Sequence, residues 1–277
     1  MEDIILFLKD SSPDGLLPYA AQMAAARRFS ITFARVEEIA LQNFLLPARY
    51  QRNRKMITLS QQLTLFRSRV AVFGCGGLGG YIIEELARLG VGGIVVVDPD
   101  IIEEHNLNRQ LLATLSLLGK KKTEAATQRI GDINPAVTLT EVTEPLTKHN
   151  GHGLLQDIDA AVDALDSIAS RLLLAEICTA CEIPLVHGAI AGWYGQLATQ
   201  FPGETTLQKI YSRNLNRQGI ETVQGNPSFT PGAVASMQVA EIVKILLQTG
   251  EPLRNRYLSV DLYHMEVNEI PLNRDET

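Results

Sequence analysis

The sequence predicts an α/β fold: a Rossmann-like, mostly parallel sheet with helices on both faces, plus a small N-terminal α/β appendage. From Arg69 onward, short β-branched runs alternate with longer segments of helical periodicity, which is typical of β-α-β units. A glycine-rich segment, residues 74–79, directly follows the first of these runs. The chain has 277 residues, of which 45% are hydrophobic, enough for one large core and a small appendage.

Each element is expected from its local pattern, taken in chain order. The short apolar runs predict strands at residues 69–73, 93–97, 137–142, 160–164, 184–187 and 257–260. Helical periodicity predicts helices at residues 79–89, 122–130, 167–181 and 230–247. Residues 203–226 lack either pattern, so we expect a long surface loop there.

The N-terminal appendage is expected to span residues 1–46, with the main domain over residues 47–277. It contains an apolar stretch at 4–8, a turn at 11–15, helical periodicity over 16–28 and a mixed segment over 31–46. The appendage carries no catalytic signature. A packing element, a dimer arm and a partner-docking module all remain open as its role.

Composition narrows the class of protein. The N-terminus, Met1-Glu2-Asp3, is acidic where a signal peptide is basic, and no apolar run approaches the roughly 18 to 20 residues that cross a bilayer. We therefore expect a cytoplasmic protein with no membrane partner. Three cysteines are too few for a disulfide framework or a four-cysteine zinc site. A net charge of −6 gives no general attraction for nucleic acid.

The glycine segment predicts a nucleotide-binding site. Its glycines are Gly74, Gly76, Gly77 and Gly79, and Asp98 ends the next predicted strand. Glycines let the backbone approach phosphates, the following helix offers free N–H groups, and the later acid can bind ribose hydroxyls. A glycine turn used only for tight packing is the competing interpretation.

Residues after the second strand bear on which nucleotide binds, because the same fingerprint serves NAD, FAD and ATP. Arg109 and Lys122 together suit a triphosphate and a departing pyrophosphate. Lys122 also begins a predicted helix, where a cation is disfavoured unless an anion lies nearby. The candidate nucleotide-binding residues of this part of the chain are Asp98, Asp100, Asn106, Arg109, Gln110 and Lys122.

A second carboxylate site lies where the strand at 160–164 ends. In an open parallel sheet the ligand sits at the carboxyl ends of the strands, so Asp166 is expected to face the phosphates. A bare carboxylate would repel them unless Mg²⁺ lay between. Asp166 is thus a candidate magnesium ligand, although a helix N-cap formed by Asp166 or Ser167 is the alternative.

These motifs resemble the ubiquitin-activating-enzyme-like superfamily, most closely its MoeB/ThiF/HesA branch, over about Arg49 to Leu272. The matching segments are residues 49–53, 74–79, 98–100, 106–110, 119–122, 132–135, 163–167 with Arg171, 184–188 and 231–247. The resemblance implies ATP-dependent adenylation of a C-terminal carboxylate, typically that of a small β-grasp, ubiquitin-like or sulfur-carrier protein ending in Gly-Gly.

The resemblance also implies roles for individual residues. Gly77 would approach phosphate, Asp98 would bind ribose, and Asp166 would bind Mg²⁺. The positions implied to hold the triphosphate are Asn106, Arg109 and Lys122. Arg52 would belong to a finger inserted from a neighbouring subunit, so a homodimer is implied; a solvated basic run over residues 49–55 is the alternative interpretation. Fixed cations would stabilise pyrophosphate without a protein nucleophile.

Two departures from the family pattern concern cysteine. The common pair of CxxC zinc motifs is absent, since residues 200–277 contain no cysteine, and no structural zinc is expected. The same stretch lacks a cysteine that could take over the acyl group. Cys178 and Cys181 are expected to be core residues, and Cys75 a small filler in the glycine loop. Attack by an external sulfur or amine donor therefore fits better than an enzyme-bound thioester.

Several alternatives remain open at this point. The missing zinc also fits an enzyme that adenylates a peptide C-terminus in natural-product biosynthesis, with the appendage clamping the peptide. It fits a tRNA threonylcarbamoyladenosine dehydratase as well, although the acidic chain argues against a nucleic-acid partner. A catalytically silent scaffold is disfavoured because all the candidate residues are present. An NAD oxidoreductase is the remaining alternative.

Overall fold

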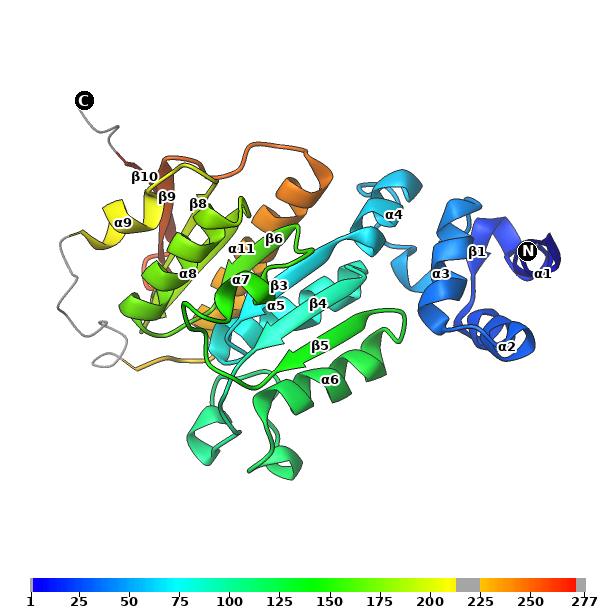
Figure 1. Ribbon diagram of the computed structural model, residues 1–277, viewed down its shortest axis with the longest axis horizontal. Coiled ribbons are helices and arrows are strands. Elements are labelled where there is room, and N and C mark those ends of the chain that lie inside the picture. Colours follow the sequence, from blue (N-terminus) through cyan, green and yellow to red (C-terminus); the bar gives the residue numbers. More distant parts are fainter. Residues whose placement is uncertain (1, 213–224, 273–277) are drawn as a thin grey trace.

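An eight-stranded sheet forms the centre of the computed structural model, which describes residues 2–212 and 225–272 (Figure 1). The strand order is β10-β9-β8-β7-β6-β3-β4-β5. Strands β3 to β7 run parallel, and β8, β9 and β10 extend the sheet with antiparallel pairings. The bounds are β3 (Arg69–Phe73), β4 (Gly93–Val97), β5 (Thr138–Val142), β6 (Ala160–Asp163), β7 (Leu185–Ala191), β8 (Tyr194–Gln200), β9 (Arg256–Asp261) and β10 (Glu266–Pro271).

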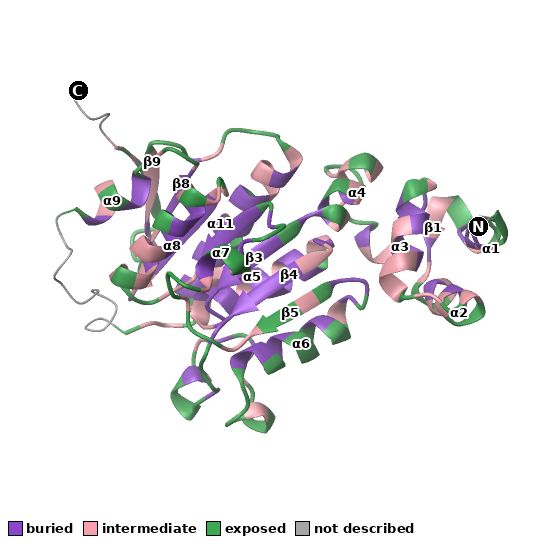
Figure 2. Cartoon of the chain, viewed as in Figure 1, coloured by how far each residue is buried: buried purple, intermediate pink, exposed green. Residues whose placement is uncertain are grey.

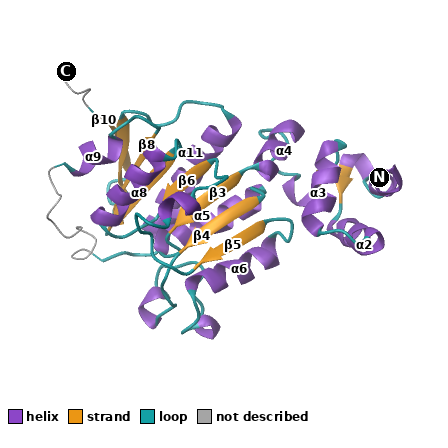
Figure 3. Cartoon of the chain, in the orientation of Figure 1, coloured by secondary structure: helices purple, strands orange, loops and turns teal. Residues whose placement is uncertain are grey.

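Helices cover both faces of this sheet (Figure 3). One face packs against α4 (Leu59–Arg67), α5 (Gly77–Leu89), α6 (Lys122–Ile133) and α11 (Phe229–Leu247). The other packs against α7 (Gly151–Leu154), α8 (Ile168–Ala180) and α9 (Thr206–Tyr211). Alternate strand residues enter the two cores, as the twofold period of a strand requires: Val70 and Val72 on one side, Ala71 and Phe73 on the other. The central strands are therefore buried on both faces (Figure 2).

The predicted strands and helices of the parallel sheet are confirmed, with bounds shifted by a few residues. Strand β8 was not predicted, because its buried polar side chains obscure the apolar pattern: Thr199 and Gln200 are fully hydrogen-bonded inside the core. Strand β10 was missed because it is a polar edge strand that ends in Pro271. The predicted loop over 203–226 is wrong in part, since α9 lies within it; residues 213–224 fall outside the described residues.

The N-terminal unit is mainly helical. It consists of α1 (Glu2–Asp10), α2 (Tyr19–Phe29) and α3 (Phe33–Gln42), which surround an apolar cluster of their own. Its only strands among the described residues are β1 (Leu16–Leu17) and β2 (Leu46–Pro47), a parallel pair of two residues each. The expected helix from residue 16 therefore begins at Tyr19, and β2 lies across the expected boundary. The division of the chain at residue 46 stays a prediction.

A buried polar cluster joins this unit to the amino end of the central sheet. The Tyr50 hydroxyl donates to Glu37 Oε1 over 2.7 Å, and Asn134 Nδ2 donates to the Tyr50 oxygen over 2.8 Å. Arg49 forms an ion pair with the fully buried Glu37 and donates to Gln22 Oε1 over 2.8 Å. Burial raises the pKa of the Glu37 carboxyl, against the opposing effect of Arg49. The cluster fixes the N-terminal unit beside α4, away from the C-terminal strands (Figure 1).

The described residues also include short 3₁₀ helices: η1 (Pro13–Gly15), η2 (Ala48–Tyr50), η3 (Glu104–Asn106) and η4 (Leu115–Leu117). Helix α11 corrects one expectation, because it is long and apolar enough to span a membrane by length and composition. Half of its apolar window is buried, however, and Val234, Val239 and Ile242 belong to the main core. We therefore interpret α11 as a core helix.

Candidate functional site

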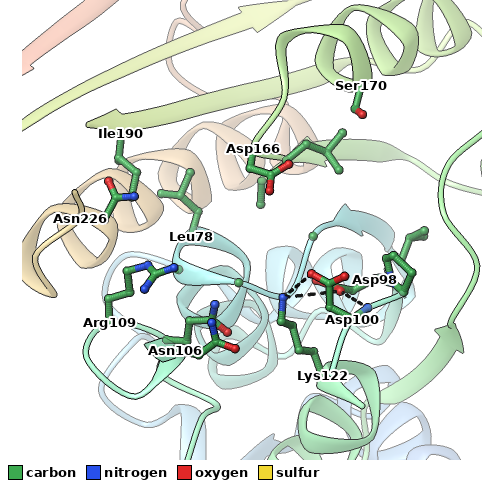
Figure 4. A pocket seen from close by; sticks show the side chains of 18 of the residues that line it. Leu78, Asp98, Asp100, Asn106, Arg109, Lys122, Asp166, Ser170, Ile190 and Asn226 are labelled. Carbon is green, nitrogen blue, oxygen red and sulfur yellow. Dashed lines mark hydrogen bonds and ion pairs between the residues drawn. The ribbon is translucent and has the colours of Figure 1, made fainter. Parts of the chain in front are cut away.

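A cavity of about 390 Å³ opens at the carboxyl ends of the parallel strands (Figure 4). Its walls come from the turn after β3, the end of β4, the segment after β6 and the last residues of β7. The structure brings together ten of the twelve candidate residues in its lining, namely Gly74, Gly76, Gly77, Asp98, Asp100, Asn106, Arg109, Gln110, Lys122 and Asp166. Gly79 and Arg52 are not in this lining.

The glycine loop presents backbone to the cavity. Gly74 has φ +99°, and a Cβ there would meet the Ala164 carbonyl oxygen at 2.5 Å, so glycine is required on both counts. Gly76 and Gly77 form the N-terminus of α5, which has no side-chain cap, leaving N–H groups available to an anion. A Cβ on Gly79 would lie 1.8 Å from the Gly74 oxygen, so Gly79 permits the close packing of helix on loop.

Asp98 is a buried carboxylate that accepts backbone hydrogen bonds. Its Oδ2 accepts from Cys75 N over 2.7 Å and its Oδ1 from Asp100 N over 2.9 Å. Burial raises the pKa of Asp98, while Lys122 and the two N–H groups oppose this effect. The carboxylate thus fixes the glycine loop while one face of it borders the cavity.

Lys122 begins α6 with its side chain 9% exposed. Its Nζ donates to Asp100 Oδ2 over 2.7 Å and lies 3.9 Å from Asp98 Oδ1. These carboxylates supply the anion that a lysine at a helix N-terminus requires. The Asp100 side chain is 64% exposed, so water can solvate it if the ammonium turns to another anion.

The wall formed by residues 105–110 provides a cation and two amides. Arg109 is partly exposed, and its Nη1 donates to His105 O over 2.9 Å and to Asn108 Oδ1 over 2.8 Å. Asn106 is buried, and its Oδ1 accepts from Glu103 N over 2.9 Å. Gln110 is also buried, with its amide beside Gly76.

Asp166 lies across the cavity from Asn106 and Lys122 (Figure 4). It is exposed, and among the described residues its carboxylate has no hydrogen-bond or ion-pair partner. Ser167, not Asp166, caps α8 by accepting from Ser170 N over 3.1 Å. Within residues 2–212 and 225–272 no three His, Cys, Asp or Glu side chains are grouped to hold a metal. A cation at Asp166 would therefore need oxygens of a ligand and water as well.

Arg52 is exposed and lies between η2 and α4, close in the sequence to Tyr50, which contacts Asn134 at the amino end of the sheet. The cavity is at the opposite, carboxyl end of the parallel strands. Arg52 therefore does not reach the cavity of its own chain, and its predicted role depends on a second copy.

Ser170, Ile190 and Asn226 also line the cavity, and sequence reasoning missed them as site residues. Ser170 lies in the first turn of α8, shortly after Asp166 in the sequence, and this closeness is the signal that could have identified it. Ile190 comes from the apolar strand β7 and Asn226 from a segment without regular structure, and neither belongs to a motif.

The cysteines do not form a reactive group. Cys75 and Cys178 are buried, and burial raises the pKa of both thiols. Cys181 was expected in the core but is partly exposed, with Sγ 3.2 Å from His152 Nδ1. It follows α8 at the amino end of β7, away from the cavity.

Comparisons with known proteins agree with this architecture. The chain is 36% identical to the SAMP-activating enzyme E1 of Haloferax volcanii over 75% of its length and 77% of that protein. It is 31% identical to the molybdopterin-synthase adenylyltransferase of Escherichia coli, over 77% of this chain and 87% of that one.

Two solved structures share the fold. PaaA gives a TM-score of 0.70 at 19% identity, covering 81% of this chain and 82% of that chain. Escherichia coli MccB with ATP gives a TM-score of 0.68 at 20% identity, covering 88% of this chain and 79% of that chain. Residues 50–277 match the ThiF family. The chain belongs to the ThiF family.

Proposed function

We propose that the chain uses ATP to adenylate the C-terminal carboxylate of a small ubiquitin-like or sulfur-carrier protein, activating it for transfer to a sulfur or amine donor. One observation carries the proposal: a single cavity joins an uncapped helix N-terminus, two cations and a bare carboxylate. Relatives named as an E1 for SAMP and as a sulfur carrier protein adenylyltransferase support the class of substrate.

The residues present fit a magnesium nucleotide. The N–H groups of the Gly76–Gly77 turn suit phosphate oxygens, and Asp98 lies where a ribose hydroxyl could be bound. Lys122 and Arg109 are the cations for the triphosphate, with Asn106 and Gln110 beside them. Mg²⁺, held by Asp166, would neutralise charge on the phosphate oxygens.

The chemistry needs positioning rather than a nucleophile from this chain. An oxygen of the substrate carboxylate forms a bond to the α-phosphorus while the bond from that phosphorus to the β-bridging oxygen breaks. Negative charge then develops on the departing pyrophosphate, where Lys122 and Arg109 stabilise it. The buried Cys75 thiol, with its raised pKa, is unsuited to accept the acyl group.

The proposal includes a homodimer in the cytoplasm, with Arg52 of each chain completing the site of the other. The exposure of Arg52 and its place at the amino end of the sheet support this arrangement, because the residue is available to another copy. The proposal includes no structural zinc, because the chain has three cysteines and none of them lies in residues 200–277.

A peptide C-terminus is the second candidate substrate. The likeness to Escherichia coli MccB crystallised with AMPCPP and MccA covers 92% of this chain, whereas the family match begins at residue 50. The likeness therefore extends into the N-terminal unit, the part expected to clamp a peptide. A tRNA substrate is disfavoured by the net charge of −6.

ATP–pyrophosphate exchange with Mg²⁺ tests the proposal. We expect exchange that requires a small protein ending in Gly-Gly and that disappears when its last glycine is deleted. Exchange supported by a short peptide alone would favour the second candidate. Mg·ATP binding without exchange, across small proteins, peptides and tRNA, would contradict carboxylate adenylation.

A further inference from the structure

Beneath Asp166, a closed ring of hydrogen bonds holds the backbone of the preceding residue, Leu165. The Leu165 N–H donates to Asp163 Oδ1 over 2.9 Å, and Asp163 Oδ2 lies 2.6 Å from His187 Nδ1. His187 Nε2 is 3.1 Å from the Tyr211 hydroxyl, which accepts from Arg171 Nη1 over 3.1 Å. Arg171 closes the ring by donating from Nε and Nη2 to the Leu165 carbonyl oxygen, over 3.1 and 2.8 Å.

The ring is buried and assembled from distant parts of the chain. Asp163 and His187 are 0% exposed, and Arg171 and Tyr211 are 4% and 6% exposed. They come from β6, β7, α8 and α9. The apolar cores of the sheet are complete without these polar groups, so their burial requires an explanation other than hydrophobic packing.

The donors around His187 define its tautomer. Gln196 Nε2 donates to the Tyr211 oxygen over 2.8 Å and lies 3.1 Å from His187 Nε2. An amide nitrogen can only donate, so Gln196 Nε2 donates to His187 Nε2, and the Asp163 carboxylate accepts from Nδ1. His187 Nε2 is therefore the acceptor, and Nδ1–H donates to Asp163.

The ring holds the backbone on both sides of one residue, because it binds both the N–H and the carbonyl of Leu165. A third contact fixes the strand end, where Gln238 Nε2 donates to the Asp163 carbonyl oxygen over 2.9 Å. Asp166, the next residue, has no partner of its own among the described residues. The ring therefore fixes the backbone from which the Asp166 side chain projects.

We propose that His187 is a positioning residue that, through Asp163 and Tyr211, holds Asp166 in the direction from which it binds Mg²⁺ of a magnesium nucleotide. The proposal rests on the proposed function, since it takes Asp166 as the magnesium ligand. Groups behind a metal ligand commonly change metal affinity by about 10- to 100-fold when they are altered.

The test uses two variants that open the ring at different places. His187→Asn keeps a donor for Asp163 and loses the contact with Tyr211, whereas Tyr211→Phe removes only the hydroxyl. A non-hydrolysable ATP analogue is titrated calorimetrically, in EDTA and over a series of Mg²⁺ concentrations. For both variants we expect unchanged affinity in EDTA and about a tenfold rise in the Mg²⁺ concentration of half-maximal effect.

Thr199→Val is the matched control. Thr199 Oγ1 donates to the buried Glu241 Oε2 over 2.7 Å, in the same sheet but away from the Asp166 segment. This variant should unfold at a lower temperature and keep the wild-type Mg²⁺ dependence. A purely structural role for His187 would make its variants behave like Thr199→Val and would overturn the proposal.

The double variant provides a second criterion. Once one substitution has broken the hydrogen-bonded ring, a second substitution in it should have little further effect. The double variant His187→Asn with Tyr211→Phe should therefore show the same Mg²⁺ dependence as the weaker-binding single variant. If the effects of the two substitutions on the Mg²⁺ concentration multiply, the two residues act independently, and the proposal that the ring acts as one unit is wrong. A wild-type protein without Mg²⁺ dependence would contradict the magnesium part of the proposed function and this role with it. A Mg²⁺-dependent wild type with unaffected variants would contradict the positioning role alone.

Discussion

The two walls of the cavity differ in whether their charged side chains are paired. On the glycine-loop wall, the Lys122 ammonium already lies against Asp100 and near Asp98. On the facing wall, Asp166 stands without a partner among the described residues, on a segment fixed from below. When a nucleotide binds, Lys122 on the glycine-loop wall must therefore exchange its carboxylate partner for a phosphate. Asp166 on the facing wall instead attracts a cation. A magnesium nucleotide satisfies both walls at once.

Removing the cation from the glycine-loop wall should have the largest effect. We expect Lys122→Ala to slow ATP–pyrophosphate exchange by about 100- to 1000-fold, because a fixed donor to the developing charge is lost. Lys120→Ala is the control, since that exposed lysine pairs only at 3.6 Å with Glu124. Equal losses in the two variants would show that general positive charge, rather than Lys122, acts in the cavity.

Removing the carboxylate from the facing wall should come next. Asp166→Asn is expected to lower exchange at saturating ATP by about 100-fold, since a metal contact of several kcal/mol is weakened. Thermal unfolding should stay at the wild-type temperature because Asp166 is exposed. An unchanged Mg²⁺ requirement would remove Asp166 from the metal site.

Substitutions at two glycines test separately how the glycine-loop wall packs and how it contacts the ligand. Gly79→Ala should destabilise the protein by about 1 to 3 kcal/mol, because its Cβ would overlap the Gly74 oxygen. Gly77→Ala meets its nearest atom at 3.5 Å, so the fold should persist while ATP affinity falls. Chemical denaturation and calorimetry distinguish the two, and a stable Gly79→Ala protein would contradict this division of roles.

The smallest effect is expected from removing the Asp100 carboxylate, the partner of Lys122 on the glycine-loop wall. An ion pair whose carboxylate is open to water is worth about 0.2 to 1 kcal/mol, so Asp100→Asn should raise ATP affinity in EDTA by roughly twofold to fivefold. The increase follows because Lys122 no longer has to leave a carboxylate. Calorimetry that found weaker binding instead would indicate that Asp100 contacts the nucleotide directly.

The sequence predicted the glycine-loop wall better than the facing wall. The glycine loop, Asp98 and Lys122 form a local pattern in which strand, turn and helix follow one another, so their meeting could be expected. The ring below Asp166 could not, because it joins Asp163 to His187 and Tyr211 through strand order and through a helix in a segment expected to be loop. Strand β8, which carries Gln196, was hidden by its own buried polar residues.

A crystal structure with a non-hydrolysable ATP analogue and Mg²⁺ tests this account of the two walls most directly. We expect the Lys122 ammonium to have left Asp100 for a phosphate oxygen, with Mg²⁺ between the phosphates and Asp166. The Leu165 backbone should remain where it is, held by the same ring. A Lys122–Asp100 pair that persists beside bound nucleotide, or a metal bound away from Asp166, would contradict the account.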